Sequence, residues 1–179
     1  IVKHIIVSDV NKNALEHGIE NIAASGVEEH IDARLGFGLD VLNDKDHIDT
    51  VLISGMGTST ILNILNDNRL VNIQKLIIQS NNDHTKLRKS LSRLGFSIKA
   101  EDYFIDNNKH YINIVFIRGK KPYTKRELRY GPILMHNKSY LNFELANCKK
   151  IYRLVPKTKI KIRCRILWEM KVLEYLLKK

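Results

Sequence analysis

Four short groups of residues in the first half of the chain have the types and spacing needed to bind a nucleotide-like ligand. Each stands at the end of an apolar run, at Asp9 and at residues 36–38, 54–57 and 79–83. Ligands of open α/β sheets bind at the carboxyl ends of the strands, where the loops converge on a crevice. The first three groups predict a cofactor crevice, and the fourth predicts a site for the edge of a nucleobase.

Asp9 follows the run HIIVS and precedes a stretch with helical periodicity. An acidic residue at this place accepts hydrogen bonds from both ribose hydroxyls of a bound adenosine cofactor. It can equally cap the helix that begins near Asn11. The sequence leaves both interpretations open.

Two glycine-containing turns follow the next strands, Gly36-Phe37-Gly38 and Ser54-Gly55-Met56-Gly57. Glycine lets the backbone approach a ligand closely or adopt positive φ, although each turn alone is also typical of an ordinary tight turn. Together with Asp9 they favour a cofactor site, in which Phe37 lies against an adenine ring.

The segment Gln79-Ser80-Asn81-Asn82-Asp83 combines amides with a carboxylate. Asn and Gln offer both a donor and an acceptor to a nucleobase edge. Asn82 or Asp83 is expected to cap the helix that starts at His84, which leaves Gln79 and Asn81 for other roles. We predict Asn81 as the first catalytic candidate and Asp83 as the second.

Apolar strand-like runs alternate with helical patterns over residues 1–98. Strands are expected at 4–9, 31–35, 49–57 and 75–83, and helices at 11–26, 58–65 and 84–95. Such repeats predict parallel pairing in a three-layer α/β sandwich. Residues 96–118 read as an antiparallel hairpin around Asp106-Asn107-Asn108. That hairpin favours the Rossmann-like class I methyltransferase sandwich over an all-parallel dinucleotide fold.

The last third of the chain differs in charge and in periodicity. Residues 1–119 carry 13 Lys and Arg against 15 Asp and Glu, whereas residues 120–179 carry 17 against 4. Residues 120–136 read as a connector, and 137–179 as two helices with narrow apolar seams joined at Pro156, an antiparallel coiled-coil hairpin. The predicted seams contain Leu141, Leu145, Cys148, Tyr152, Val155, Ile162, Ile166, Met170, Leu173 and Leu177.

The basic character of the hairpin predicts contacts with a polyanion, although a solvated basic face would look the same. The predicted RNA contacts are Lys86, Arg88, Lys157, Lys159, Lys161, Arg163 and Arg165.

Several function classes are excluded or disfavoured. The seven histidines and two cysteines have no metal-ligand spacing, so no metal is expected. No apolar run approaches the ~20 residues that a bilayer requires, so we expect no membrane association. Cys148 and Cys164 are expected to be free thiols of a cytoplasmic monomer.

Beyond these patterns, the sequence resembles the bacterial tRNA (adenine-22-N1)-methyltransferase family. The similar segments are VSDVNKNALEHGIENIAASGVEEHIDARLGFGLDVL, DTVLISGMG, LIIQSNN followed by KLRKSL, KHYINIVF and YGPILM. The resemblance implies a class I methyltransferase domain over residues 1–119, a C-terminal coiled coil, S-adenosylmethionine as cofactor and tRNA as partner. The cofactor contacts expected on this basis are Asp9, Val10, Gly36, Phe37, Gly38, Ser54, Gly55, Met56 and Gly57.

The chain departs from the family's pattern at three positions. Thr58 stands where a second glycine is usual, Phe37 replaces the aspartate of a Gly-Asp-Gly turn, and Ser80 replaces the proline of Gln-Pro-Asn. The resemblance also implies a first strand and an Asp-x-Gly-Ser-Asp-His-Ala loop, which cradles the methionine moiety and supplies an acidic catalytic residue. Both would precede Ile1, so we expect the beginning of the catalytic domain to be missing from this sequence.

Two other interpretations remain open. Asp9 would serve the ribose of a nicotinamide cofactor equally well, but the antiparallel hairpin and the lack of a dehydrogenase acid/base pair argue against an oxidoreductase. A noncatalytic RNA-binding module with a degenerate methyltransferase domain is the remaining alternative.

Overall fold

A computed structural model describes residues 4–179 and divides the chain into two compact units. The first unit takes in the described residues up to Val51 together with Ser59–Gln74, and the second takes in Leu52–Thr58 and Lys75–Lys179. The C-terminal helices belong to the same unit as most of the larger sheet, and the expected domain boundaries at residues 119 and 137 stay predictions.

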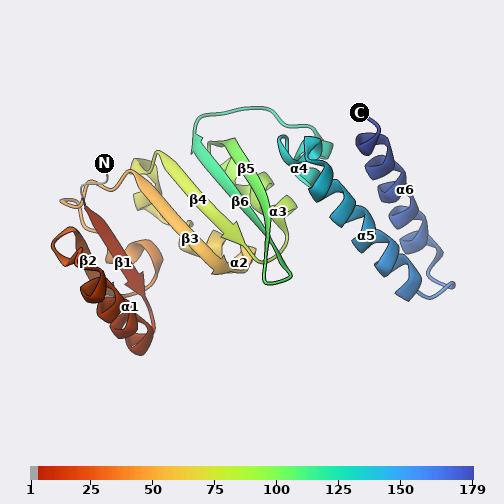
Figure 1. The fold of residues 1–179 in the computed structure, drawn as a ribbon. Coiled ribbons are helices and arrows are strands. Elements are labelled where there is room, and N and C mark those ends of the chain that lie inside the picture. Colours follow the sequence, from red (N-terminus) through yellow and green to blue (C-terminus); the bar gives the residue numbers. More distant parts are fainter. Residues whose placement is uncertain (1–3) are drawn as a thin grey trace. The chain divides into compact units, whose positions relative to one another are not determined.

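The elements follow the order expected from the sequence (Figure 1). The strands are β1 (Ile5–Asp9), β2 (Ile31–Leu35), β3 (Thr50–Met56), β4 (Lys75–Ser80), β5 (Phe96–Asp106) and β6 (Lys109–Arg118). The α-helices are α1 (Lys12–Ser25), α2 (Thr58–Ile64), α3 (His84–Arg93), α4 (Lys125–Tyr130), α5 (Lys138–Leu154) and α6 (Ile160–Leu177). Short 3-10 helices are η1 (Glu28–His30), η2 (Gly38–Val41), η3 (Asn68–Asn72) and η4 (Leu134–His136).

In the first unit β1 and β2 pair in parallel, with Asp9 opposite Leu35 at the carboxyl end. Helix α1 joins them. The Asn11 side chain caps it by accepting from the backbone N–H groups of Asn13 and Ala14, and Gly26 ends it in the left-handed region at φ 64°. Leu15 is buried as the helical pattern predicts, whereas Ile19 remains 45% exposed.

The second sheet has the strand order β3-β4-β6-β5. Strands β3 and β4 run in the same direction, because Gln74 N donates to Asp49 O at one end and Asn81 N donates to Met56 O at the other. Strands β4, β6 and β5 pair antiparallel in turn. The β5–β6 turn has positive φ at Asn107 and Asn108, a combination typical of a type I′ hairpin turn.

The predicted α/β class is confirmed. Among the described residues the strands form a two-stranded sheet, β1-β2, and the four-stranded sheet. The core of the larger sheet is aliphatic and aromatic, and its fully buried members include Leu76, Ile78, Ile114 and Phe116, with Leu87 and Leu91 from α3.

The segment expected as a connector is folded. Thr124 and Glu127 form a capping box that starts α4, and Tyr130 and Leu134 are buried. Gly131 lies so close to Glu101 that a Cβ at this position would clash with its carboxylate.

Helices α5 and α6 run antiparallel as a hairpin (Figure 1). Leu141, Leu145, Cys148 and Leu173 of the predicted seams are buried, but Ile162 is 50% exposed and Leu176 is buried in addition. Coiled-coil packing of this hairpin stays a prediction.

Candidate functional site

In the first unit Asp9 ends β1 beside the glycine turn that follows β2. Gly36 N donates to Asp9 O at 3.0 Å, so the backbones of the two strand ends are joined. The Asp9 carboxylate accepts from Asn11 N through Oδ1 at 2.7 Å, and its Oδ2 has no hydrogen-bond partner among the described residues. Asn11, not Asp9, caps α1, so one carboxylate oxygen is available to a ligand.

The turn at residues 36–38 needs both of its glycines. A Cβ at Gly36 would stand 2.6 Å from Val41 Cγ1, and Gly38 has φ 53° with Ile64 Cγ2 2.8 Å from its ideal Cβ position. Phe37 between them is 39% exposed, and Val10 is 65% exposed. The turn therefore presents an aromatic side chain to solvent near the end of β1.

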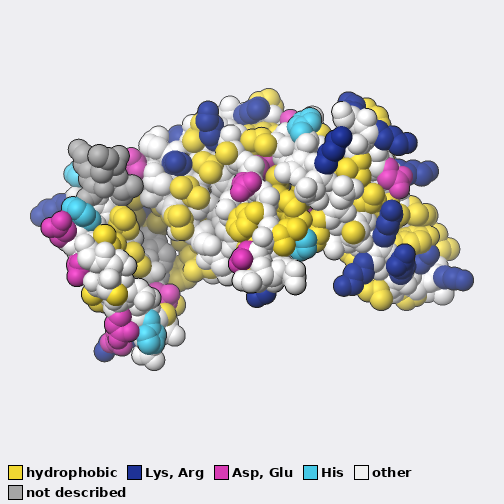
Figure 2. All heavy atoms as spheres, viewed as in Figure 1, with side chains coloured by type: hydrophobic (Ala, Val, Ile, Leu, Met, Phe, Trp, Pro, Cys, Tyr) yellow, Lys and Arg dark blue, Asp and Glu magenta, His cyan; other side chains and the backbone are white. Residues whose placement is uncertain are grey.

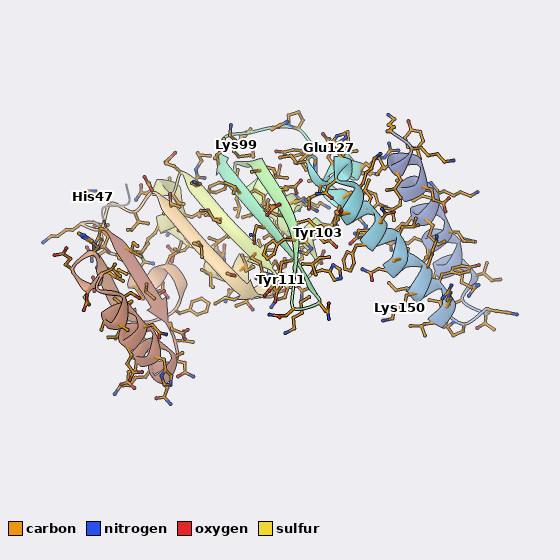
Figure 3. The ribbon with its side chains drawn as sticks, in the orientation of Figure 1. His47, Lys99, Tyr103, Tyr111, Glu127 and Lys150 are labelled. Atoms are coloured by element: carbon orange, nitrogen blue, oxygen red, sulfur yellow. The ribbon has the colours of Figure 1, made fainter. Side chains whose placement is uncertain are left out.

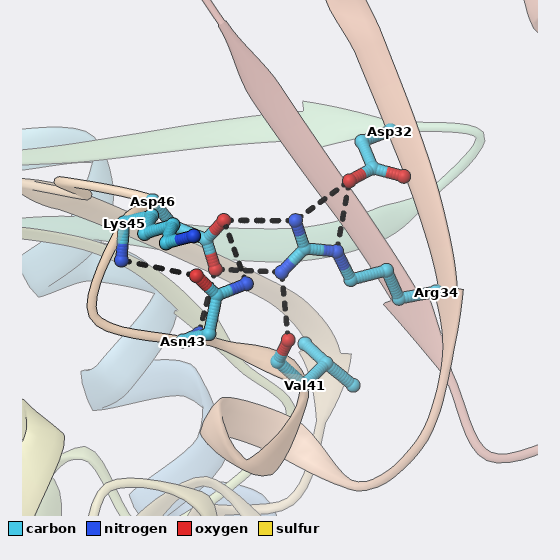
Figure 4. Close-up of polar contacts among 6 residues, drawn as sticks. All are labelled: Asp32, Arg34, Val41, Asn43, Lys45 and Asp46. Atoms are coloured by element: carbon cyan, nitrogen blue, oxygen red, sulfur yellow. Dashed lines mark hydrogen bonds and ion pairs between the residues drawn. The ribbon is translucent and has the colours of Figure 1, made fainter.

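Arg34 on β2 fixes the segment that follows this turn (Figure 4). Its guanidinium donates to Asp46 through Nη1 at 2.6 Å and through Nη2 at 2.8 Å, and Nε donates to Asp32 at 2.9 Å. Nη1 also donates to Val41 O. The hydrogen bonds from Arg34 hold the pKa of Asp46 far below its usual range. Sequence reasoning missed this cluster because Asp46 lies 12 residues from Arg34 in a loop.

In the second unit the ends of β3 and β4 are held together by side chains. Gln79 Oε1 accepts from Gly55 N at 2.7 Å and from Ser54 Oγ at 3.2 Å. Asn81 Nδ2 donates to Gly55 O at 2.7 Å, and Gln79 Nε2 donates to Asn81 Oδ1 at 3.2 Å. The sequence analysis expected Gln79 and Asn81 to be available for other roles. In the structure both side chains instead form hydrogen bonds that hold the turn at residues 54–57.

Two of the three departures from the family's pattern contact each other. Thr58 Oγ1 and Ser80 Oγ lie 2.8 Å apart, and both are buried. Thr58 Oγ1 also donates to Asn82 O at 2.6 Å, while Thr58 N donates to Asn82 Oδ1 at 3.0 Å. These contacts fix the start of α2 against the end of β4.

Asp83 caps α3, which confirms one of the two capping residues that the sequence offered, Asn82 and Asp83. Its φ is 42°, and its Oδ1 accepts from Lys86 N at 3.0 Å. His84 Nε2 contacts Ser80 O at 3.0 Å, and burial together with the charge of Arg88 lowers the pKa of His84 to about 4. Asn81, Asn82 and Asp83 are exposed at this strand end.

The prediction that Arg88 contacts RNA is wrong, because its side chain is completely buried. Its Nε donates to Glu101 Oε1 at 2.7 Å, and Nη1 donates to the carbonyl groups of Leu128 and Arg129. Glu101 Oε2 in turn accepts from Ile133 N at 2.9 Å. This ion pair attaches the α4–η4 segment to the sheet and is closed to a phosphate group.

The other basic residues gather on the hairpin, where dark blue side chains cover α5 and α6 (Figure 2). Lys157, Lys159, Lys161 and Arg165 are exposed, as is Lys86. Arg163 is instead engaged within the hairpin, since Nη1 donates to Val155 O at 2.7 Å and the guanidinium stacks 3.8 Å from the Tyr152 ring. It is a smaller part of the exposed basic surface than predicted.

No group of three or more His, Cys, Asp or Glu residues in the described part of the chain is arranged to hold a metal ion. Between residues 4 and 179 no helix has the length and apolarity to cross a bilayer.

Comparisons with known proteins identify a family and several similar solved structures. A family model described as tRNA (adenine(22)-N(1))-methyltransferase matches residues 1–173. A search of curated proteins finds no match.

Solved structures from three bacteria are similar over nearly the whole chain. A Streptococcus agalactiae protein of the NADB-Rossmann superfamily is 30% identical, with TM-score 0.87, covering 98% of this chain and 80% of its own. A putative tRNA (m1A22) methyltransferase of Streptococcus pneumoniae in complex with S-adenosyl-L-methionine is 26% identical, with TM-score 0.88 and coverage of 98% and 81%. The TrmK protein of M. capricolum in complex with S-adenosyl-homocysteine is 27% identical, with TM-score 0.81 and coverage of 98% and 81%.

Proposed function

The chain belongs to the tRNA (adenine(22)-N(1))-methyltransferase family, and we propose how its residues divide the work of that reaction. The chain transfers a methyl group from S-adenosylmethionine to N1 of an adenine in tRNA. The observation that carries this function is the family match, which spans both strand-end clusters and most of the basic hairpin. The division of roles among residues is the proposal.

Asp9 is the proposed ribose ligand. Its free Oδ2 suits the two adjacent hydroxyls of an adenosine ribose, because an ionised carboxylate accepts several hydrogen bonds. Val10 and the turn at residues 36–38 are proposed to contact the adenine, with the exposed Phe37 ring in place of a polar contact. This combination of a carboxylate acceptor and apolar surface fits an adenosine cofactor.

The turn at residues 54–57 is the proposed contact for the reactive end of the cofactor. Its conformation is fixed before any ligand binds, because Gln79 and Asn81 hold both the N–H and the carbonyl of Gly55. When bound, S-adenosylmethionine supplies an electrophilic methyl group to the N1 lone pair. Positioning supplies much of the rate of such a displacement.

Asn81 and Asp83 are the proposed catalytic residues. Adenine N1 carries its own lone pair, so the chain needs no general base, but the methylated ring becomes cationic. Asn81 Oδ1 and the carboxylate of Asp83 are exposed acceptors that stabilise a positive charge developing nearby. The target base must leave its stack, at a cost of a few kcal/mol.

The exposed basic residues of the hairpin are the proposed tRNA contacts. Lys157 and Lys159 lie in the bend between α5 and α6, and Lys161 and Arg165 lie one turn apart on α6. They meet phosphates from several directions and supply affinity without sequence readout. We infer that the protein acts as a monomer in the cytoplasm, the compartment that contains its tRNA partner.

Calorimetry separates this function from its alternatives. S-adenosylmethionine is expected to bind with one site per chain, and NAD is expected not to bind. Binding of NAD alone would indicate an oxidoreductase, and binding of tRNA with neither cofactor would indicate a noncatalytic RNA-binding module.

A further inference from the structure

A cavity of about 370 Å3 lies in the second unit, where the start of α3 meets α5 and α6. Its lining includes Asp83, His84, Arg129, Tyr140, Glu144 and Glu169. Asp83 is two residues beyond Asn81, so the cavity adjoins the strand end to which the proposed function assigns the reacting base. Its volume is within the range of small-ligand sites.

His84 offers this cavity an acceptor and not a charge. Ser80 O can only accept, so the 3.0 Å contact places the ring hydrogen on Nε2 and leaves Nδ1 with its lone pair. Nδ1 has no hydrogen-bond partner among the described residues. Burial lowers the pKa of His84 to about 4, which keeps the ring neutral at neutral pH.

Two carboxylates in the wall lie near the Arg129 guanidinium, and Glu169 Oε1 also lies 3.6 Å from Arg165 Nε. Arg129 Nη2 lies 3.1 Å from Glu169 Oε2 and 3.7 Å from Glu144 Oε2. Both glutamates are mostly buried, and burial raises the pKa of Glu144. The lining contains three carboxylates, Asp83, Glu144 and Glu169, against two cationic side chains, so the cavity disfavours a phosphate group and is rich in acceptors. Lys150, which Figure 3 labels on α5, is one of the two cationic side chains of the lining, and Arg129 is the other.

We propose that this cavity binds an unstacked adenine of the tRNA through its exocyclic amino group, with His84 Nδ1 and Glu144 as acceptors. This inference rests on the proposed function, because that function identifies tRNA as the molecule that supplies the adenine. A flat heterocycle that presents N–H donors matches acceptors on two sides and the buried ring of Tyr140. A methylated adenine, which is cationic, matches the excess of carboxylates better still.

Isolated nucleosides test this binding without turnover. The readout is the 13C-methyl NMR signal of Ile166, which lines the cavity, with buried Ile61 of the first unit as a reference signal. Adenosine is expected to shift the Ile166 signal with a dissociation constant of about 1 mM, and N1-methyladenosine with a lower one. Inosine, which lacks the amino group, should bind about tenfold more weakly, the scale of one lost hydrogen bond to a charged acceptor. Equal binding of inosine, or no shift of Ile166 with any nucleoside, overturns the proposal.

Glu144→Gln is the matched variant, and Glu174→Gln, at an exposed position on α6, is its control. Glu144→Gln should remove most of the preference for N1-methyladenosine over adenosine, whereas Glu174→Gln should keep it. Retention of the full preference by Glu144→Gln overturns the assignment of that acceptor.

Steady-state kinetics on tRNA distinguish the target adenine from a neighbouring one. If the cavity takes the target, Glu144→Gln lowers kcat at saturating tRNA. If it takes a neighbour, the KM for tRNA rises while kcat is kept, and no change in either overturns the inference. Failure of nucleoside binding in a protein that still methylates tRNA defeats the inference alone, whereas nucleoside binding without methylation defeats the proposed function alone.

Discussion

The side-chain amide of Asn81 donates to the carbonyl oxygen of Gly55 across 2.7 Å, although 26 residues separate them. The Asn81 side chain also accepts from Gln79 Nε2, and the side-chain oxygen of Gln79, Oε1, accepts from Gly55 N. The predicted substrate contact and the predicted cofactor turn are therefore one hydrogen-bonded unit. A change at Asn81 acts on both.

Asn81→Ala is expected to lower kcat by more than about threefold at saturating cofactor and tRNA, about 0.65 kcal/mol in the barrier. The reason is the loss of an acceptor for the developing ring charge together with the release of Gly55 O. Rapid-quench methylation measures the rate, and calorimetry measures cofactor affinity. If the variant binds cofactor more weakly but its kcat is within threefold of the parent's, Asn81 has only a structural role in holding the turn at residues 54–57.

Asp9→Ala is expected to weaken S-adenosylmethionine binding by about 1–3 kcal/mol, the scale of hydrogen bonds to a charged acceptor. Asn11 still caps α1 in this variant, so the helix should persist. Asp9→Asn keeps the size of the side chain and removes the charge, so its affinity for S-adenosylmethionine should lie between those of the parent and of Asp9→Ala. Calorimetric affinity equal to the parent's in the folded Ala variant would remove Asp9 from the ribose site.

Glu101→Gln is expected to lower the free energy of unfolding by about 3–5 kcal/mol, because Arg88 would keep a buried charge without its counter-ion. Replacing both residues, Arg88→Met with Glu101→Leu, should restore most of that loss. Urea unfolding followed by circular dichroism measures both, with Glu174→Gln as the exposed control. If the single variant is as stable as the parent, the ion pair does not hold the α4–η4 segment to the sheet.

Local patterns in the sequence predicted the strands, the glycine turns and helices α1, α2, α3, α5 and α6, but not α4. Apolar runs of β-branched residues fix β1, β3 and β4, and the glycine turns follow them as expected. Arg88 shows the limit of this reasoning, since an arginine in a basic helix looks exposed until Glu101 and the end of α4 are seen around it. Burial of such a residue depends on contacts between segments that are distant in the chain.

The candidate site shows the same limit. Residue types identified Asp9 and the two turns, but the bracing of Gly55 by Gln79 and Asn81 depends on the parallel register of β3 and β4. The Thr58–Ser80 contact likewise joins residues 22 apart that the sequence presents as separate departures. Arg163 looked like an exposed cation, yet the end of α5 uses its guanidinium.

Lys157, Lys159 and Lys161 changed together to Gln should weaken tRNA binding and flatten its salt dependence. Each lost phosphate contact removes about 0.7–0.9 from the slope of log affinity against log salt. The matched control changes Lys45, Lys75 and Lys99, which are exposed outside the hairpin and alter the net charge equally. Fluorescence anisotropy with labelled tRNA measures both, and equal slopes for the two triple variants would assign the hairpin lysines to solubility.

Methylation of unmodified, transcribed tRNA tests the central claim most directly. The chain is incubated with the tRNA and S-adenosylmethionine, and the nucleosides released by digestion are separated and weighed by mass spectrometry. We expect N1-methyladenosine to form in a cofactor-dependent manner and to disappear when the adenine at position 22 is replaced. Formation of a different methylated nucleoside, or of none by a chain that binds both cofactor and tRNA, would contradict the account.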